Sequence, residues 1–103
     1  MATITQVSVW RPRDGKLQEF SAKVVTAKKI HGRLGAKVRV HQSAIGGQPM
    51  AIHYVMEHAS WEDFGEFGAK MDADSEWQQF WGDAAANPTG DLLQNFVVNE
   101  LPI

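Results

Sequence analysis

Proton transfer is the chemistry that this sequence is best equipped for. His31, Tyr54 and His58 carry groups that exchange protons or hydrogen-bond to a ligand. His31 is expected in an apolar helical stripe, and Tyr54 and His58 on one face of a strand. A Tyr–His pair in an apolar site can activate a phenol or an enol, so these three are the candidate catalytic residues. The alternative is structural, because buried histidines often bond to a carbonyl and buried tyrosines pack with the hydroxyl paired.

A dense block of aromatic residues follows in the second half of the chain. Stacked rings suit a flat aromatic ligand or a haem, although rings at helical spacing also simply cover a sheet. The residues expected to bind a ligand are Trp61, Phe64, Trp77, Phe80 and Trp81. Gly65 and Gly68 fall inside the same helical stretch, where glycine costs roughly 1 kcal/mol. They indicate either close packing or room beside the sheet.

Several other classes of site are excluded. The chain has no cysteine, which rules out disulfides, thiolate zinc sites and a cysteine nucleophile. No phosphate-binding loop, dinucleotide fingerprint or serine-hydrolase elbow is present, and no cofactor is predicted. His41 and His53 are expected to face each other across two strands, with Glu57 or Asp91 as a conceivable third metal ligand. Because the spacing of these residues does not supply the three or four protein ligands that a zinc site needs, no metal is predicted.

The charge and hydropathy of the chain limit the classes of partner that it is expected to bind. The net charge is −2 and the isoelectric point is about 6.0, whereas a nucleic-acid-binding surface needs a basic excess. No signal peptide begins the sequence, and no apolar run approaches the length of a membrane helix. We therefore expect a cytoplasmic protein that binds neither nucleic acid nor a membrane.

The elements that must position these residues alternate along the chain. Strands are predicted over residues 3–10, 36–44, 51–59 and 91–101. A helix is predicted over 15–34, with Asp14 as N-cap and Gly35 as the stop, and two short helices begin at Ser60 and Ser75. The two middle strands form a hairpin, in which His41 faces His53 so that one face is apolar and the other carries opposed charges.

This order, β-α-β-β-α(α)-β, predicts one ferredoxin-like α+β domain over residues 1–103. Its four-stranded antiparallel sheet carries helices on one face only. The last strand offers apolar residues on both faces, with Leu92, Phe96 and Val98 on one side. Apolar residues on both faces imply that both are covered, so we expect a second copy to cover the bare face.

The chain also resembles a known group of proteins. The segments VWRPRDGKLQEF, HGRLGAKVRVHQS and WEDFGEFGAKMDADSEWQQFW are similar to the dimeric α+β barrel superfamily, which includes antibiotic-biosynthesis-monooxygenase-like and NIPSNAP-like proteins. The last segment is most like the NIPSNAP-like group. The resemblance implies a dimeric α+β barrel that binds small molecules between sheet and helices. Some members oxygenate aromatic substrates without a cofactor, some bind haem, some cyclise polyketides, and some have no known reaction. No complete catalytic residue set is shared, so none is transferred.

Two functional interpretations follow. In the first, a homodimer binds an aromatic or polyketide-like compound and acts as a cofactor-independent monooxygenase-like or cyclase-like enzyme. In the second, it is a non-catalytic dimeric module that binds a ligand or assembles with itself. A haem-binding variant, with His31 or His58 as the axial ligand, lies between them.

Overall fold

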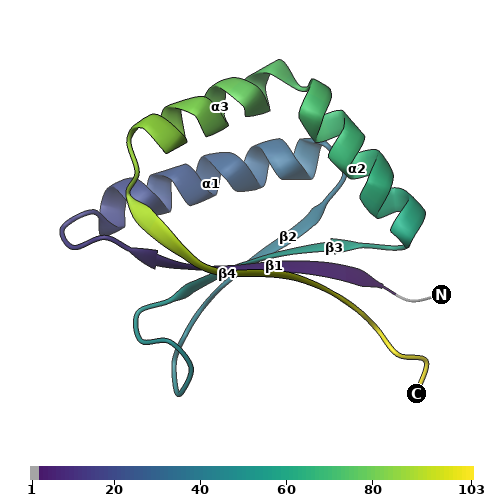
Figure 1. Cartoon of the computed structure of the whole chain (residues 1–103), viewed down its shortest axis with the longest axis horizontal. Coiled ribbons are helices and arrows are strands. Elements are labelled where there is room, and N and C mark those ends of the chain that lie inside the picture. The colour runs from purple at the N-terminus through teal and green to yellow at the C-terminus, as the bar shows by residue number, and fades with distance from the viewer. Residues whose placement is uncertain (1–2) are drawn as a thin grey trace.

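The computed structural model describes residues 3–103, and the predicted order of elements is confirmed over that range (Figure 1). The strands are β1 (Ile4–Pro12), β2 (Lys37–Gln42), β3 (Ile52–His58) and β4 (Gly90–Asn99), and the helices are α1 (Leu17–Arg33), α2 (Trp61–Ala73) and α3 (Ser75–Ala86). All three helices lie on the same side of the sheet. The opposite side carries none of the described helices, as the ferredoxin-like prediction requires.

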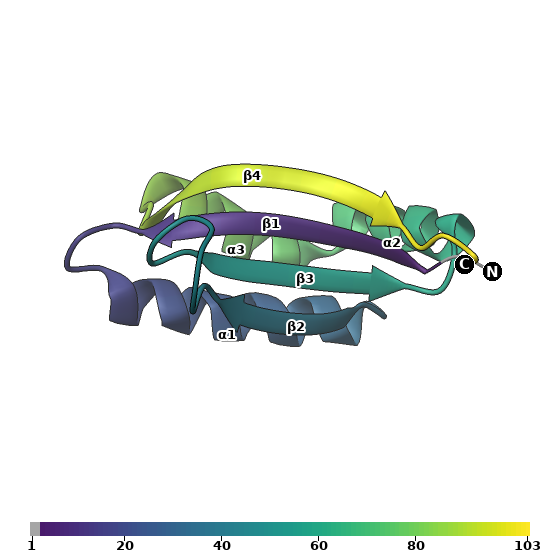
Figure 2. The same cartoon turned by 90° about the horizontal axis from the view of Figure 1, so that it is seen from below.

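The strands form one antiparallel sheet in the order β2-β3-β1-β4 (Figure 2). The predicted hairpin register is confirmed, since His41 pairs with His53 and Lys37 pairs with Glu57. β1 lies in the interior of the sheet, so its helix-facing side chains form the middle of the floor beneath the helices.

A bulge changes the faces of β4. Trp10 pairs with Leu92 while Val9 pairs with Gln94, which leaves Leu93 as the extra residue. Leu92 therefore faces the helices, whereas Phe96 and Val98 pair with Val7 and Thr5 on the bare face. The predicted grouping of Leu92 with Phe96 and Val98 is wrong, because one inserted residue reverses the alternation of side chains.

The caps of α2 and α3 differ in how well they were predicted. The Ser60 hydroxyl accepts a hydrogen bond from the Asp63 amide at 3.1 Å, which begins α2 as expected. The cap of α3 is Asp74, whose carboxylate accepts from the Trp77 amide at 2.9 Å. Ser75 is instead the first helical residue, so its prediction as a cap is wrong. A carboxylate suits this position because it also meets the positive end of the helix.

α1 begins two residues later than expected and is tied to α3 at its other end. Its N-cap position is Lys16, without a side-chain cap, so the prediction of Asp14 is wrong. Gly35 ends the helix as predicted, with a φ of 107° that favours glycine. Arg33, in the last turn, donates to Asp74 at 2.9 Å and to Glu76 at 2.7 Å. These contacts hold the start of α3 against the end of α1.

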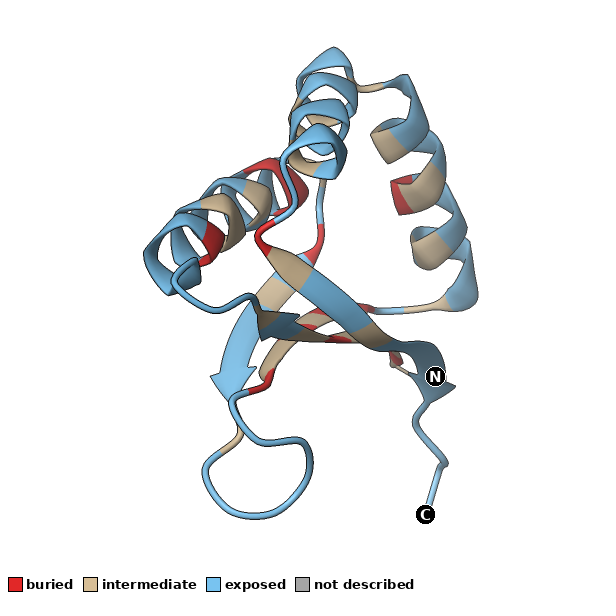
Figure 3. Cartoon of the chain, turned by 60° about the vertical axis from the view of Figure 1, so that its left-hand side comes forward, coloured by how far each residue is buried: buried red, intermediate tan, exposed pale blue. Residues whose placement is uncertain are grey.

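The core lies between the sheet, α1 and α2, and α3 contributes no buried residue (Figure 3). Its buried residues include Ile4, Phe20, Ile30, Met56 and Phe67. Because none of its side chains is buried, α3 adds no residue to this core. Within residues 3–103, no helix has both the length and the apolar character needed to cross a membrane.

Candidate functional site

A cavity of about 610 Å³ lies between the sheet and the helices, mainly under α1 and α3. Its walls are largely aromatic and apolar, as in small-molecule sites. The aromatic side chains that line it are Trp10, Phe20, Tyr54, Trp77, Phe80 and Trp81. His31 lines the same cavity, so two of the three candidate catalytic residues share it with three of the predicted ligand-binding rings.

The structure joins His31 to Tyr54. His31 comes from the buried stripe of α1 and Tyr54 from the helix-facing side of β3, and Nδ1 lies 2.6 Å from the phenolic oxygen. The direction of this hydrogen bond depends on the imidazole tautomer: with the ring proton on Nε2 the Tyr54 hydroxyl donates to Nδ1, and with the ring proton on Nδ1 the imidazole donates to the phenolic oxygen. In either form Nε2 is buried and has no partner among residues 3–103. A purely structural histidine was expected to hydrogen-bond to a backbone carbonyl, but the partner of Nδ1 is the Tyr54 hydroxyl.

Burial keeps both members of this pair uncharged. Burial, with a smaller contribution from His58, lowers the pKa of His31 to about 4. Burial also raises the pKa of the Tyr54 phenol. At neutral pH the cavity thus presents a neutral imidazole bonded to a neutral phenol. Such a pair accepts and donates hydrogen bonds without requiring a charged ligand.

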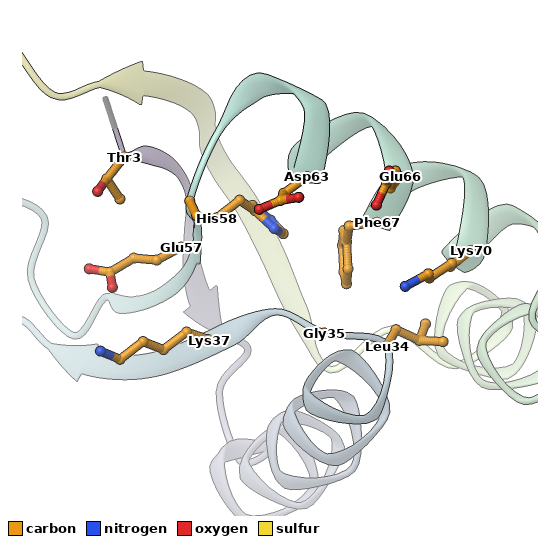
Figure 4. A pocket seen from close by; sticks show the side chains of 11 residues that line it. Thr3, Leu34, Gly35, Lys37, Glu57, His58, Asp63, Glu66, Phe67 and Lys70 are labelled. Atoms are coloured by element: carbon orange, nitrogen blue, oxygen red, sulfur yellow. The ribbon is translucent and has the colours of Figure 1, made fainter. Parts of the chain in front are cut away.

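His58, the third candidate, lies elsewhere. It lines a separate cavity of about 440 Å³ beside α2 and the end of β3, and its imidazole points toward Asp63 and Phe67 (Figure 4). Burial lowers its pKa, and the nearby Asp63 carboxylate partly opposes that shift. Its Nε2 atom is buried without a partner within the described part of the chain. The predicted pairing of Tyr54 with His58 is not formed, because Tyr54 reaches α1 instead.

The predicted aromatic group is divided between two places. Trp77 and Trp81 stack with ring centroids 5.7 Å apart, and Trp77 lies 4.3 Å from the His31 ring, at the wall of the larger cavity. Phe64 packs instead on His58 at 5.4 Å, and Trp61 is 58% exposed and packs on Phe64. Neither Trp61 nor Phe64 lines the larger cavity.

The glycines of α2 do not serve close packing. A Cβ atom at Gly65 or Gly68 would meet nothing within 4 Å, so neither position brings another element near. The second explanation, room for a ligand, gains no support either, because neither glycine lines a described cavity.

Sequence reasoning missed a polar group on the floor of the larger cavity. Gln6 and Ser8 of β1 and Asn95 of β4 line it beside Trp10. The Gln6 amide donates to the Asn95 side-chain oxygen at 3.3 Å, and the Trp10 indole donates to Ser8 Oγ at 3.1 Å. The alternation of strand 3–10 carried the signal, since residues 6 and 8 share the face of residues 4 and 10.

The structure offers no ligand set for a metal at His41 and His53 within the described residues. His41 and His53 do face each other, but Glu57 and Asp91 are each engaged in an ion pair with an arginine, at 2.8 Å and 3.0 Å. Within residues 3–103, no three His, Asp or Glu side chains are grouped so that they could hold a metal.

The haem alternative fits the residues poorly as well. Tyr54 occupies Nδ1 of His31, and the Nε2 atoms of His31 and His58 are both buried among neighbouring rings. An axial ligand needs an accessible nitrogen lone pair. No haem chemistry is therefore assigned.

The comparisons with known proteins identify the fold. No protein-family model matches the chain, and no curated protein matches its sequence. Among solved structures, a NIPSNAP family protein from Agrobacterium tumefaciens superposes with a TM-score of 0.73 at 23% identity, over 98% of this chain and 86% of that one. An uncharacterised NIPSNAP domain protein from Burkholderia xenovorans gives 0.70 at 17% identity, over 97% and 94%.

A third match comes from Bordetella bronchiseptica. It is a protein provisionally described as an antibiotic biosynthesis monooxygenase, with a TM-score of 0.64 at 19% identity, over 100% of this chain and 99% of that one. The resemblance seen in the sequence is therefore confirmed: the structural neighbours are NIPSNAP family proteins and a monooxygenase-like protein. At these identities, the likeness establishes the fold and leaves the chemistry to the site itself.

Proposed function

We propose that this protein binds a small, flat, largely apolar molecule in the larger cavity, with one hydroxyl or carbonyl of the ligand at the His31–Tyr54 pair. The observation that carries the proposal is a neutral imidazole–phenol pair, 2.6 Å apart, in the wall of an aromatic cavity of about 610 Å³. Aromatic walls supply stacking and apolar burial, and the few polar groups orient the ligand.

The same pair can carry out chemistry by relaying a proton. A proton leaves an acidic O–H or C–H of the ligand for the Tyr54 oxygen, while the Tyr54 proton passes to His31 Nδ1. The ligand becomes an anion beside an imidazolium, and their attraction offsets part of the burial that lowers the pKa of His31.

Two reactions continue from such an anion without a cofactor. In a monooxygenation, O₂ oxidises a CH₂ group to C=O, and the second oxygen atom leaves as water. In a cyclisation, the carbanion attacks a carbonyl of the same molecule, a C–C bond forms, and the new alkoxide recovers the proton from the imidazolium. Both reactions need a flat substrate with an acidic position, which is the kind of ligand that the cavity favours.

We further propose that the protein acts as a homodimer. The bare face of the sheet presents Val7, Val55, Phe96 and Val98, with Phe96 43% and Val98 47% exposed. Exposed apolar side chains clustered on one face are typical of protein interfaces. A second copy of the same sheet offers a complementary surface of the same character.

The alternative is a ligand-binding or assembly module that performs no reaction. A pKa of about 4 makes His31 a weak base, which favours binding over proton abstraction. Oxygen uptake with anthrone separates the two, since anthrone is flat and has an acidic CH₂. The enzyme consumes one O₂ per anthrone and forms anthraquinone and water, faster than His31→Gln. A binding module leaves the rate at that of buffer.

Binding itself is tested by titrating 2-naphthol into the protein by calorimetry. Ala84 of α3 is half-buried and lines the cavity, so Ala84→Phe fills it and weakens binding about tenfold or more. Ala86, two residues further along α3, is exposed and does not line it, so Ala86→Phe is the matched control. Equal affinity in wild type and Ala84→Phe, or no heat of binding in the wild type, would refute the cavity as a ligand site.

A further inference from the structure

The floor of the larger cavity is more polar than a packed core allows. Gln6, Ser8 and Asn95, here called the polar floor, face the helices from β1 and β4; Gln6 and Ser8 are half-buried, and Asn95, on the edge strand, is exposed. β1 is an inner strand, and inner positions beneath helices ordinarily carry apolar residues. Polar side chains in such a place cost free energy unless water or a ligand satisfies them. A ligand that displaces water from the polar floor must therefore offer hydrogen-bonding groups in return.

The polar floor keeps hydrogen-bonding capacity for that partner. Ser8 Oγ accepts from the Trp10 indole, which leaves its own O–H to donate. Asn95 uses its oxygen to accept from Gln6, which leaves its NH₂ group to donate and the Gln6 oxygen to accept. Within residues 3–103 these remaining groups have no side-chain partner. The floor thus offers two donors and one acceptor to the cavity.

None of these groups is charged. The charged residues that line the cavity are Lys23 and Asp72, outside the polar floor, and the Lys23 ammonium donates to the backbone oxygen of Asn87. A neutral amide and hydroxyl pair well with a hydroxyl or a carbonyl, but they do not neutralise a carboxylate or an amine. The chemistry of the floor favours an uncharged oxygen group.

The floor lies next to the His31–Tyr54 pair. Ser8 is paired with Tyr54 on one side and with Asn95 on the other, so the three side chains form a row across neighbouring strands about 5 Å apart. The Tyr54 side chain extends up to His31 on α1, whereas Ser8 and Asn95 are short. One flat molecule can therefore contact the pair with one end and the floor with another.

We infer that the polar floor selects ligands that carry a second uncharged oxygen, a hydroxyl or carbonyl, besides the one held at His31–Tyr54. The inference rests on the proposed function and names the substrate class of the same site: flat apolar molecules with two separated neutral oxygen groups. Asn95 and Ser8 are the specificity-determining residues, because they supply the donors.

The test compares matched ligands and matched variants by calorimetry. 2,6- and 2,7-dihydroxynaphthalene are each titrated against the analogue in which a methyl replaces one hydroxyl, so that size is kept. We expect at least one diol to bind wild type about 3- to 10-fold more tightly than its analogue, as one neutral hydrogen bond provides. Asn95→Leu abolishes that preference while the methyl analogue still binds. Ser8→Ala, a small change that leaves the chain folded, reduces it.

Gln94→Leu is the control, because Gln94 pairs with Val9 on the opposite face of the sheet, and it retains the preference. If the diols and their analogues bind wild type equally, the inference is overturned while the proposed ligand site stands. The same holds if Asn95→Leu keeps the full preference. If neither diol nor analogue binds, both the proposed function and the inference fail.

Discussion

The Nδ1 atom of His31 lies 2.6 Å from the hydroxyl oxygen of Tyr54, which joins α1 to β3 at the wall of the larger cavity. The contact satisfies two polar groups that the core would otherwise bury alone. It also leaves His31 Nε2 buried without a partner in the described part of the chain. The pair is thus sensitive to protonation, because a second proton on the imidazole would have no acceptor beside Nε2.

Stability should fall with acid because of His31. Its pKa is about 4 in the folded protein against 6.5 for a free histidine, so below pH 6.5 the unfolded chain binds a proton that the native state refuses. The loss runs between about pH 6.5 and pH 4 and amounts to about 3 kcal/mol. Chemical denaturation across that range, compared with His31→Gln, isolates this contribution from the carboxylates. Parallel pH profiles for the two proteins would contradict the assignment.

Removing the Tyr54 hydroxyl should cost more than one hydrogen bond. Tyr54→Phe leaves His31 Nδ1 buried and unpaired, which lowers the free energy of unfolding by about 1–3 kcal/mol. In the double variant His31→Gln/Tyr54→Phe, no imidazole is left unpaired. The loss in the free energy of unfolding should therefore be smaller than the sum of the losses in the two single variants. Urea denaturation of the four proteins measures the coupling. Strict additivity would show that the two side chains do not depend on each other.

Alanine substitutions at two glycines should change the free energy of unfolding in opposite directions. Gly65→Ala should raise the free energy of unfolding by about 1 kcal/mol, because its Cβ meets nothing and alanine favours the helix. Gly90→Ala should lower it by about 1–3 kcal/mol, because its Cβ would lie 2.6 Å from the Phe20 ring. Thermal denaturation of both variants decides the matter. A stable Gly90→Ala would mean that Phe20 can move aside freely.

The bare face of the sheet should control assembly. Wild type should sediment at twice the 11.5 kDa mass of the chain, and Phe96→Glu at the mass of one chain, because a charge would be buried in the interface. Val97→Glu is the control, since Val97 is 38% exposed and faces the other side of β4. A monomeric wild type would refute the homodimer, and an unaffected Phe96→Glu dimer would place the interface elsewhere.

Much of the fold was predictable because the two faces of the hairpin strands carry different side chains, apolar on one face and charged on the other. The hairpin register could be read from His41, His53 and their neighbours, since a slip by one residue would have mixed charged and apolar side chains. The bulge at Leu93 could not, because both faces of β4 carry apolar residues and the pattern gives no preferred alternation. A cap shifted by one residue, from Ser75 to Asp74, is a similar failure, since both side chains can cap a helix.

The candidate site was predictable only in part. The stripe of α1 placed His31 correctly inside, and the alternation of β3 placed Tyr54 on the face beneath the helices. Their contact depends on how α1 lies across the sheet, which sequence periodicity does not fix. The same periodicity grouped Tyr54 with His58, although the two line different cavities. Long-range packing, rather than local pattern, decides which side chains meet.

The most direct test of the ligand site uses the methyl groups of the methionines. Met56 and Met71 line the larger cavity, whereas Met50 is 65% exposed in the hairpin loop outside it. With carbon-13 in the methionine methyl groups, NMR spectra are recorded as 2-naphthol is added. We predict that the Met56 and Met71 signals shift in proportion to saturation while the Met50 signal stays in place. Unchanged Met56 and Met71 signals at saturating 2-naphthol would contradict a ligand site between the helices and the sheet.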